Sequence, residues 1–221
     1  MLRDEGRAPE TLAKVLASSR YGGQLLERSP ASVAVFGTSD ARVPLTRAQL
    51  AITIRAAIAR QDDDDATLLA IRLARRSELI RIAVANLTGA LDRDGLELTL
   101  TDLMAATLQR LFEVAIRHVE KASDAELSTR ITIIGMGRFG SRELGYARDA
   151  DVVFVHGPAP GVDAQHAQSQ VKQVVAFLRE GLSVSEPDPA FGVDTNLRPD
   201  GKAGPMVRTS AFYVYLLQTL V

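Results

Sequence analysis

The sequence contains no cysteine, no excess of one charge and no long apolar run, and each absence excludes a class of protein. With zero Cys the chain has no disulfide scaffold, thiol nucleophile or cysteine zinc site. Its 26 Lys and Arg residues nearly balance 27 Asp and Glu residues, so no net charge draws it to nucleic acid or to an anionic membrane. No segment reaches the roughly 18 apolar residues of a membrane helix, and the start, MLRDEGRAPE, lacks the apolar centre of a signal peptide. We therefore expect a cytoplasmic protein with neither nucleic acid nor membrane as partner.

Hydrophobic residues recur at helical spacing in the first half of the chain. Thr46 and Gln49 have the spacing of a capping box at a helix start. The four aspartates at 62–65 resemble a metal cluster, but a long periodic segment follows them, and negative charge is favoured at a helix N-terminus. A further helix is expected at 101–121. Residues 1–126 are therefore predicted to form a helical bundle.

The hydrophobic period changes from helical to strand-like at 131–134, after a polar stretch. Farther on, a strand at 152–155, a helix at 163–181 and a short strand around Asp194 alternate. This order predicts an α+β fold, with a second domain at 127–221 built on a small mixed sheet. Because the final segment, SAFYVYLLQTLV, is apolar and ends without a cap, we expect this domain to be truncated at its C-terminus.

Two carboxylates stand one residue apart where the apolar strand begins. Side chains alternate along a strand, so Asp149 and Asp151 would face the same site. They follow a glycine-rich turn, GMGRFGS, whose backbone N–H groups we expect to be free. Hard oxygen donors on one rigid edge suit Mg²⁺ with nucleotide phosphates. With Asp194 on an adjoining strand, three carboxylates could hold the two Mg²⁺ ions of in-line nucleotidyl transfer.

The glycines also match the dinucleotide-binding pattern GxGxxG at Gly135, Gly137 and Gly140. That fold needs a full crossover helix, with an acidic residue about 20 positions on at the end of the next strand. Here the intervening helix is short and leads directly to Asp149. The three histidines are scattered, without the spacing of a triad or a zinc site. The pattern favours nucleotidyl transfer over hydride transfer.

The Gly-Ser turn, the D-x-D pair and the third aspartate resemble the DNA polymerase β-like nucleotidyltransferase superfamily. Two longer segments, GMGRFGSRELGYARDADVVFVH and VDTNLRPDGKAGPMVRTSAFYVY, resemble glutamine synthetase adenylyltransferases. Members of that family attach AMP to a tyrosine of glutamine synthetase and remove it, using two such domains. The resemblance covers nearly the whole chain and implies that the chain is a fragment with one nucleotidyltransferase domain.

This resemblance implies roles for single residues. Asp149 and Asp151 would bind both metal ions, and Asp194 the catalytic one, with Mg²⁺ as cofactor and ATP as substrate. The residues proposed to hold the triphosphate are Gly137, Gly140, Ser141, Arg198 and Lys202. The implied partners are glutamine synthetase and a PII-type signalling protein, in the regulation of nitrogen metabolism.

The chain departs from the family pattern at two positions: Ser141 replaces a usual Gly, and Arg148 a usual Ser. We expect Arg148 to point outward, because it precedes Asp149 and alternates to the opposite side. VDTNLRP resembles the adenylylating half, VDANLRP, more than the removing half, IDLRLRP, which favours adenylylation over phosphorolytic removal. Two alternatives stay open: a non-catalytic nucleotide- or effector-binding regulatory module of this fold, and a uridylyltransferase acting on a signalling protein.

Overall fold

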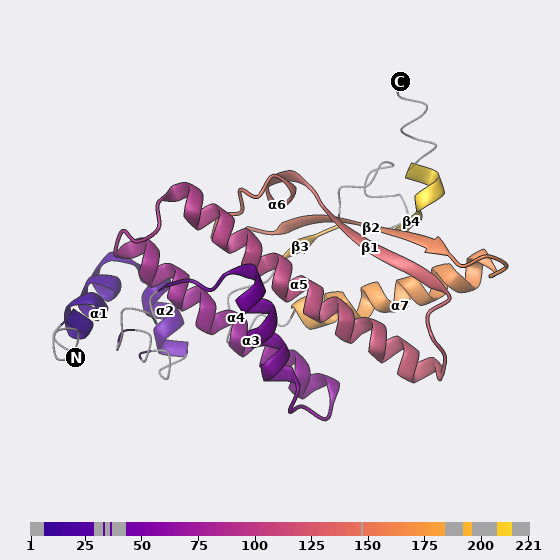
Figure 1. Cartoon of the computed structure of the whole chain (residues 1–221), viewed down its shortest axis with the longest axis horizontal. Helices are drawn as coiled ribbons and strands as arrows, with labels where there is room; N and C mark the ends of the chain where they lie inside the picture. Colours follow the sequence, from indigo (N-terminus) through magenta and orange to yellow (C-terminus); the bar gives the residue numbers. More distant parts are fainter. Residues whose placement is uncertain are drawn as a thin grey trace, which may run out of the picture. The chain divides into compact units, whose positions relative to one another are not determined.

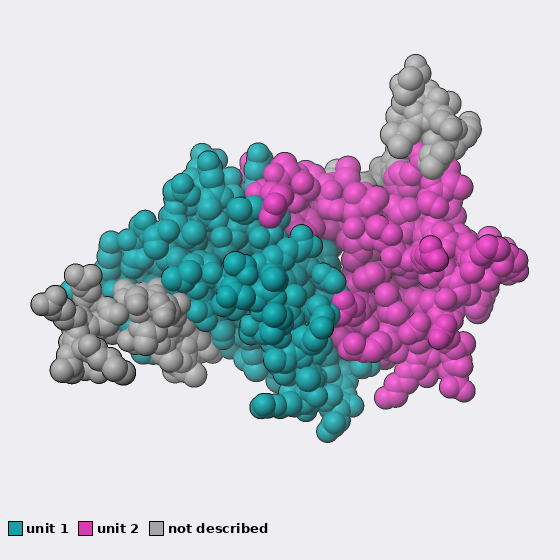
Figure 2. Space-filling model, in the orientation of Figure 1, with its two compact units in different colours: residues 1–110, 143–146, 185–189 teal, residues 111–142, 147–184, 190–221 magenta. Residues whose placement is uncertain are grey.

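The structure, a computed structural model, describes residues 7–28, 33, 36, 43–146, 148–183, 192–195 and 207–213. Its helices and strands follow the chain in the order labelled in Figure 1. No helix among these residues is long and apolar enough to cross a membrane. The chain divides into two compact units, coloured in Figure 2. Unit 1 takes the described residues up to 110 together with 143–146, and unit 2 takes the others.

Unit 1 is helical. Its helices are α1 (Arg7–Ser18), α2 (Arg20–Arg28), α3 (Arg47–Ile58), α4 (Asp64–Leu87) and the first part of α5 (Arg93–Ser123). The predicted capping box opens α3: the Gln49 N–H donates to Thr46 Oγ1, and the Thr46 N–H donates to Gln49 Oε1. Asp63 caps α4 and accepts the Ala66 N–H at 2.7 Å. The interpretation of the four aspartates as a helix start is confirmed.

The core of unit 1 lies along α4, which α1, α2 and α3 contact. Ile71, Ile82 and Val84 of α4 are fully buried, as are Leu50 and Ile54, one helical turn apart on α3. Burying each such side chain contributes about 1.5–3 kcal/mol, so this apolar face, more than helix propensity, stabilises the bundle.

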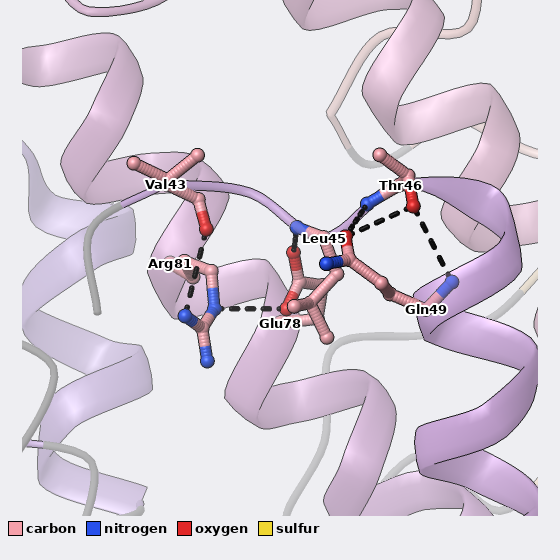
Figure 3. A network of polar contacts seen from close by, with 6 residues as sticks. All are labelled: Val43, Leu45, Thr46, Gln49, Glu78 and Arg81. Carbon is pink, nitrogen blue, oxygen red and sulfur yellow. Dashed lines mark hydrogen bonds and ion pairs between the residues drawn. The ribbon is translucent and has the colours of Figure 1, made fainter. Parts of the chain in front are cut away.

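A buried carboxylate joins the segment before α3 to α4 (Figure 3). Glu78 is 3% exposed and accepts the Leu45 N–H at 2.7 Å and Arg81 Nε–H at 3.0 Å. Arg81 also donates to the carbonyl oxygen of Val43 at 3.5 Å. Desolvation raises the pKa of Glu78, although the Leu45 N–H and Arg81 both act to lower it.

Replacing Glu78 by Gln should remove a pH dependence of stability. Because the pKa of Glu78 is raised on folding, its contribution is complete below the unfolded pKa near 4.5 and is lost as pH rises through the folded pKa. Gln keeps an acceptor for the Leu45 N–H but does not titrate. We expect the free energy of unfolding of Glu78→Gln, relative to the parent, to increase as the pH rises from the unfolded pKa near 4.5 through the raised folded pKa.

Urea denaturation at several pH values measures this difference. Glu97→Gln is the control, since Glu97 pairs with the largely exposed Arg93 and an exposed pair contributes about 0–1 kcal/mol. Parallel pH profiles for Glu78→Gln and the parent would contradict the prediction.

Unit 2 contains a four-stranded sheet. Its elements are the rest of α5, β1 (Thr129–Gly135), α6 (Gly137–Gly140), β2 (Ala150–Pro158), α7 (Ala164–Ser183), β3 (Val193–Asp194) and β4 (Val207–Thr209). β2 is central: it runs antiparallel to β1 and parallel to β3 and β4. Since β1 pairs with nearly all of β2, β3 and β4 use its other edge. The predicted α+β class with a small mixed sheet is confirmed.

Helix α7 lies along one face of β1 and β2 (Figure 1). Its buried stripe repeats at helical spacing and comprises Ala167, Val171, Val174, Val175 and Leu178. On the opposite face of β1, Arg130, Thr132 and Ile134 are exposed. Ile134 is opposite Val153, and Asp151 lies two residues before Val153. Alternation therefore places Asp151 on this open face.

The change from helix to strand lies between Ser123, the end of α5, and Thr129, the start of β1. This is the region in which the sequence predicts it. The compact units divide earlier, between residues 110 and 111, because the long helix α5 contributes to both. The division into domains at 126/127 stays a prediction.

Candidate functional site

The predicted carboxylates Asp149 and Asp151 lie at the start of β2, and two backbone hydrogen bonds hold this start in place. The N–H of Ala150 donates to the carbonyl oxygen of Gly192 at 2.8 Å, on the β3 side. The N–H of Met136 donates to the carbonyl oxygen of Asp151 at 2.8 Å, on the α6 side. Ala150 is fully buried, whereas Asp149 is exposed and Asp151 is half-buried. The Ala150 methyl group is therefore buried, while the two flanking aspartates are more exposed.

The third predicted carboxylate, Asp194, lies on β3 directly beside Asp151 in the parallel register. Side chains of directly paired residues project from the same face, and neighbouring strands are about 4.7–4.9 Å apart. Two metal ions in a nucleotidyl-transfer site are about 3.5–4 Å apart. The backbone separation is therefore compatible with a shared site for these two residues.

Each carboxylate of the D-x-D pair lies against a glycine. The Asp151 carboxylate lies against Gly137, and the Asp149 carboxylate against Gly192; a Cβ at either glycine would overlap carboxylate atoms. Asp151 thus lies toward the glycine turn and Asp149 toward the segment that enters β3. Within the described ranges, no three acidic, His or Cys side chains are grouped closely enough to hold a metal ion. Metal binding by Asp149, Asp151 and Asp194 stays a prediction.

The glycine turn forms α6, a single helical turn. The N–H of Gly140 donates to the carbonyl oxygen of Met136 at 2.8 Å, and the N–H of Ser141 donates to that of Gly137 at 3.0 Å. The expectation that the N–H groups of this turn are free is therefore wrong for Gly140 and Ser141. A short helical turn closes its own i to i−4 hydrogen bonds and leaves only its first N–H groups without a helical acceptor. Glycine composition alone does not distinguish this turn from an open loop.

The remaining predicted residues have different outcomes. Arg198 and Lys202 lie outside the described residues. Ser141 is exposed, and its hydroxyl donates to the carbonyl oxygen of Arg138 at 3.4 Å. Arg148 is also exposed, which agrees with the outward orientation expected for it. In the described part of the chain it makes no ion pair with Asp149 or Asp151.

Sequence reasoning assigned no role to His156, which is 3% exposed in β2. Its Nδ1 lies 3.2 Å from Thr129 Oγ1, and desolvation lowers its pKa, so the ring is neutral near pH 7. It lines a pocket of about 660 Å³ near the end of β2 away from Asp151, together with Arg130 and Ser210. No spacing signal in the sequence marks this pocket, because its lining comes from separate segments.

The register predicts an energetic coupling between Asp151 and Asp194. Like charges directly opposite each other on neighbouring strands destabilise a sheet. Replacing either residue by Asn should therefore maintain or raise the free energy of unfolding. The same replacement should raise this free energy less when the other aspartate has already been replaced. Urea denaturation in a double-mutant cycle without divalent cations measures this coupling. Asp124→Asn, at the exposed end of α5, is the control; additivity between the site pair would contradict the register.

The exposure of Arg148 predicts a nearly silent substitution. An exposed ion pair contributes only about 0–1 kcal/mol, so Arg148→Ser should change the affinity for Mg²⁺-ATP by less than about threefold. Calorimetric titration measures it, with Arg130→Ser as the control that removes one exposed charge from β1. A tightening of about tenfold, equivalent to roughly 1.4 kcal/mol, would mean that Arg148 reaches the carboxylates.

The small mixed sheet thus places Asp151 beside Asp194 and next to a tight glycine turn. A family profile described as glutamate-ammonia ligase adenylyltransferase matches residues 9–219. The chain belongs to this family, and the resemblance noted in its sequence is confirmed.

The curated relatives are longer enzymes of one name. The bifunctional glutamine synthetase adenylyltransferase/adenylyl-removing enzyme of Streptomyces coelicolor is 41% identical over 228 residues, covering 96% of this chain and 22% of the relative. Enzymes of that name from Streptomyces avermitilis and Cutibacterium acnes are each 39% identical; the matches cover 96% of this chain and 23% and 20% of the relatives. The chain thus spans about a fifth of the length of these relatives.

Proposed function

We propose that this chain supplies a DNA polymerase β-like nucleotidyltransferase domain that transfers AMP between ATP and a tyrosine of glutamine synthetase. The observation that carries the proposal is the β2–β3 register, which aligns Asp194 with Asp151. Asp149 precedes Asp151 by two residues and lies immediately before β2. Membership of the adenylyltransferase family supports the choice of AMP as the transferred group.

The donor set suits Mg²⁺. Asp149, Asp151 and Asp194 offer only hard carboxylate oxygens, and Mg²⁺ prefers oxygen ligands and is held through few carboxylates with substrate phosphates. These three residues would hold the metal, which supplies charge neutralisation of the triphosphate and activation of the attacking oxygen. The open face of the sheet leaves Asp151 on the side from which a nucleotide can approach.

The glycine turn is the proposed phosphate-binding element. The exposed Ser141 hydroxyl can donate to a phosphate oxygen, and Gly137 and Gly140 themselves carry no side chain that would obstruct it. Arg198 and Lys202 are proposed to neutralise phosphate charge through charge-assisted hydrogen bonds.

In the forward reaction the tyrosine hydroxyl oxygen attacks the α-phosphorus of ATP and pyrophosphate leaves. In the removal reaction inorganic phosphate attacks the α-phosphorus of adenylyl-tyrosine, the tyrosine oxygen is the leaving group, and ADP is the product. The same three carboxylates serve both directions. The amino-acid sequence that begins at β3, VDTNLRP, favours adenylylation. We further propose a cytoplasmic location and regulation by a PII-type signalling protein.

Replacing Asp151 by Asn should abolish AMP transfer without unfolding the protein. In a full-length protein of this family, we expect adenylylation of glutamine synthetase to fall by at least about 100-fold, because stabilisation of the transition-state charge is lost. The melting temperature should stay the same or rise, since clustered carboxylates repel one another. Transfer of labelled AMP and thermal denaturation are the two measurements.

Asp124→Asn is the matched control, because Asp124 is an exposed aspartate of unit 2 outside the sheet. Three outcomes would count against the proposal. Binding of Mg²⁺-ATP that is insensitive to Asp151→Asn would favour a non-catalytic regulatory module. A preference for UTP over ATP would favour a uridylyltransferase. Cooperative loss of structure in the variant would mean that Asp151 is a structural carboxylate.

A further inference from the structure

We infer that Gly192 and Gly137 are positioning residues, which set where the carboxylates of Asp149 and Asp151 lie. The inference rests on the proposed function, in which these carboxylates hold the cation. The two glycines come from separate segments on opposite sides of β2: Gly192 enters β3, and Gly137 begins α6. Each leaves free the space that one carboxylate occupies.

Gly192 is the clearer case. Its carbonyl oxygen accepts the N–H of Ala150 at 2.8 Å, so its backbone is held against the start of β2. The φ of Gly192 does not lie in the positive range that favours glycine, so other residues could adopt this φ. The three atoms nearest to an added Cβ at position 192 all belong to Asp149, and the Cβ would overlap its carboxylate oxygen and Cγ. The absence of a Cβ at residue 192 therefore leaves space for the Asp149 carboxylate.

A Cβ at residue 192 would move the Asp149 carboxylate rather than disrupt the fold. Asp149 is exposed, so its side chain can turn away. Because side chains occupy staggered rotamers, the Asp149 side chain would rotate by about 120° in χ1. This rotation would move its carboxylate by about 2 Å. A misplacement of about 1 Å can reduce catalysis by about 100-fold. The expected loss is therefore in cation binding and not in stability.

Gly137 combines two requirements. Its φ is +50°, in the left-handed region, and a Cβ there would overlap the Asp151 carboxylate. Backbone strain alone would therefore disfavour Ala at this position. Gly161, in the same unit, has φ +80° and nothing within 4 Å of an added Cβ. Gly161→Ala thus reproduces the backbone strain of Gly137→Ala without the contact to a carboxylate.

The experiment compares Gly192→Ala, Gly137→Ala and the control Gly161→Ala with the parent chain. Calorimetry measures the affinity for Mg²⁺-ATP, and NMR couplings between backbone nuclei and the carboxyl carbon report the χ1 rotamer of Asp149 without any metal. For Gly192→Ala we expect a changed Asp149 rotamer, an affinity at least about tenfold lower and a melting temperature within a few degrees of the parent. For Gly161→Ala we expect a lower melting temperature and an affinity within about twofold.

An unchanged Asp149 rotamer in Gly192→Ala would overturn the inference for this pair. So would a changed rotamer with parental Mg²⁺-ATP affinity, provided that Asp149→Asn loses binding. Equal losses of affinity in Gly137→Ala and Gly161→Ala would overturn it for Asp151, since strain alone would then account for both. If the parent chain and Asp149→Asn bind Mg²⁺-ATP equally, the proposed function fails, and the metal-free rotamer measurement still decides whether Gly192 positions Asp149.

Discussion

The geometry of the candidate site depends on two backbone hydrogen bonds that leave the start of β2 in opposite directions. Ala150 donates to Gly192 on one side, and Asp151 accepts from Met136 on the other. They bring the glycine turn and the β3 segment, more than 50 positions apart in the chain, to one strand. Since buried backbone groups must be paired, this junction is stable only while both neighbours are present. The backbone at this junction sets the directions of the side chains that it carries. The positions of the three predicted carboxylates therefore depend on the backbone hydrogen bonds.

The sequence predicts the elements whose signals are local and repeated. The capping box at Thr46, the helix start at residues 62–65 and the change of period before β1 all depend on neighbouring residues. The expectation that Asp149 and Asp151 share a face comes from strand alternation alone and stays a prediction, because Asp149 precedes the first residue of β2. The sequence places Asp194 on an adjoining strand, but it could not give the parallel register of β2 and β3. β3 is two residues long and has no period of its own, and parallel register is set by tertiary contacts.

The hydrogen bonds of α6 escaped prediction, and the sequence carries no signal at residue 110, where the compact units divide. A four-residue helix and an open glycine loop have the same composition, and only the closed Gly140 and Ser141 N–H groups distinguish them. Likewise, the apolar stripe of α5 continues across residue 110, so nothing in its period marks where one compact unit ends. The α6 hydrogen bonds depend on the backbone conformation of a single turn, and the division of the units depends on contacts between segments.

The glycine pattern shows how one motif can serve a different purpose in a different fold. In a dinucleotide-binding turn, glycines allow the backbone to approach a phosphate and a strand. Here Gly137 makes room for the protein's own Asp151 carboxylate, and a Cβ at Gly140 would lie 2.7 Å from the carbonyl oxygen of Gly135. The glycines are thus accounted for by contacts within unit 2, before any ligand is considered. A turn that already holds a carboxylate beside its backbone disfavours an uncompensated phosphate at the same place. The turn can accept an anion only when a cation lies between that anion and the carboxylate. This requirement constrains the spacing between the glycine turn and the aspartate.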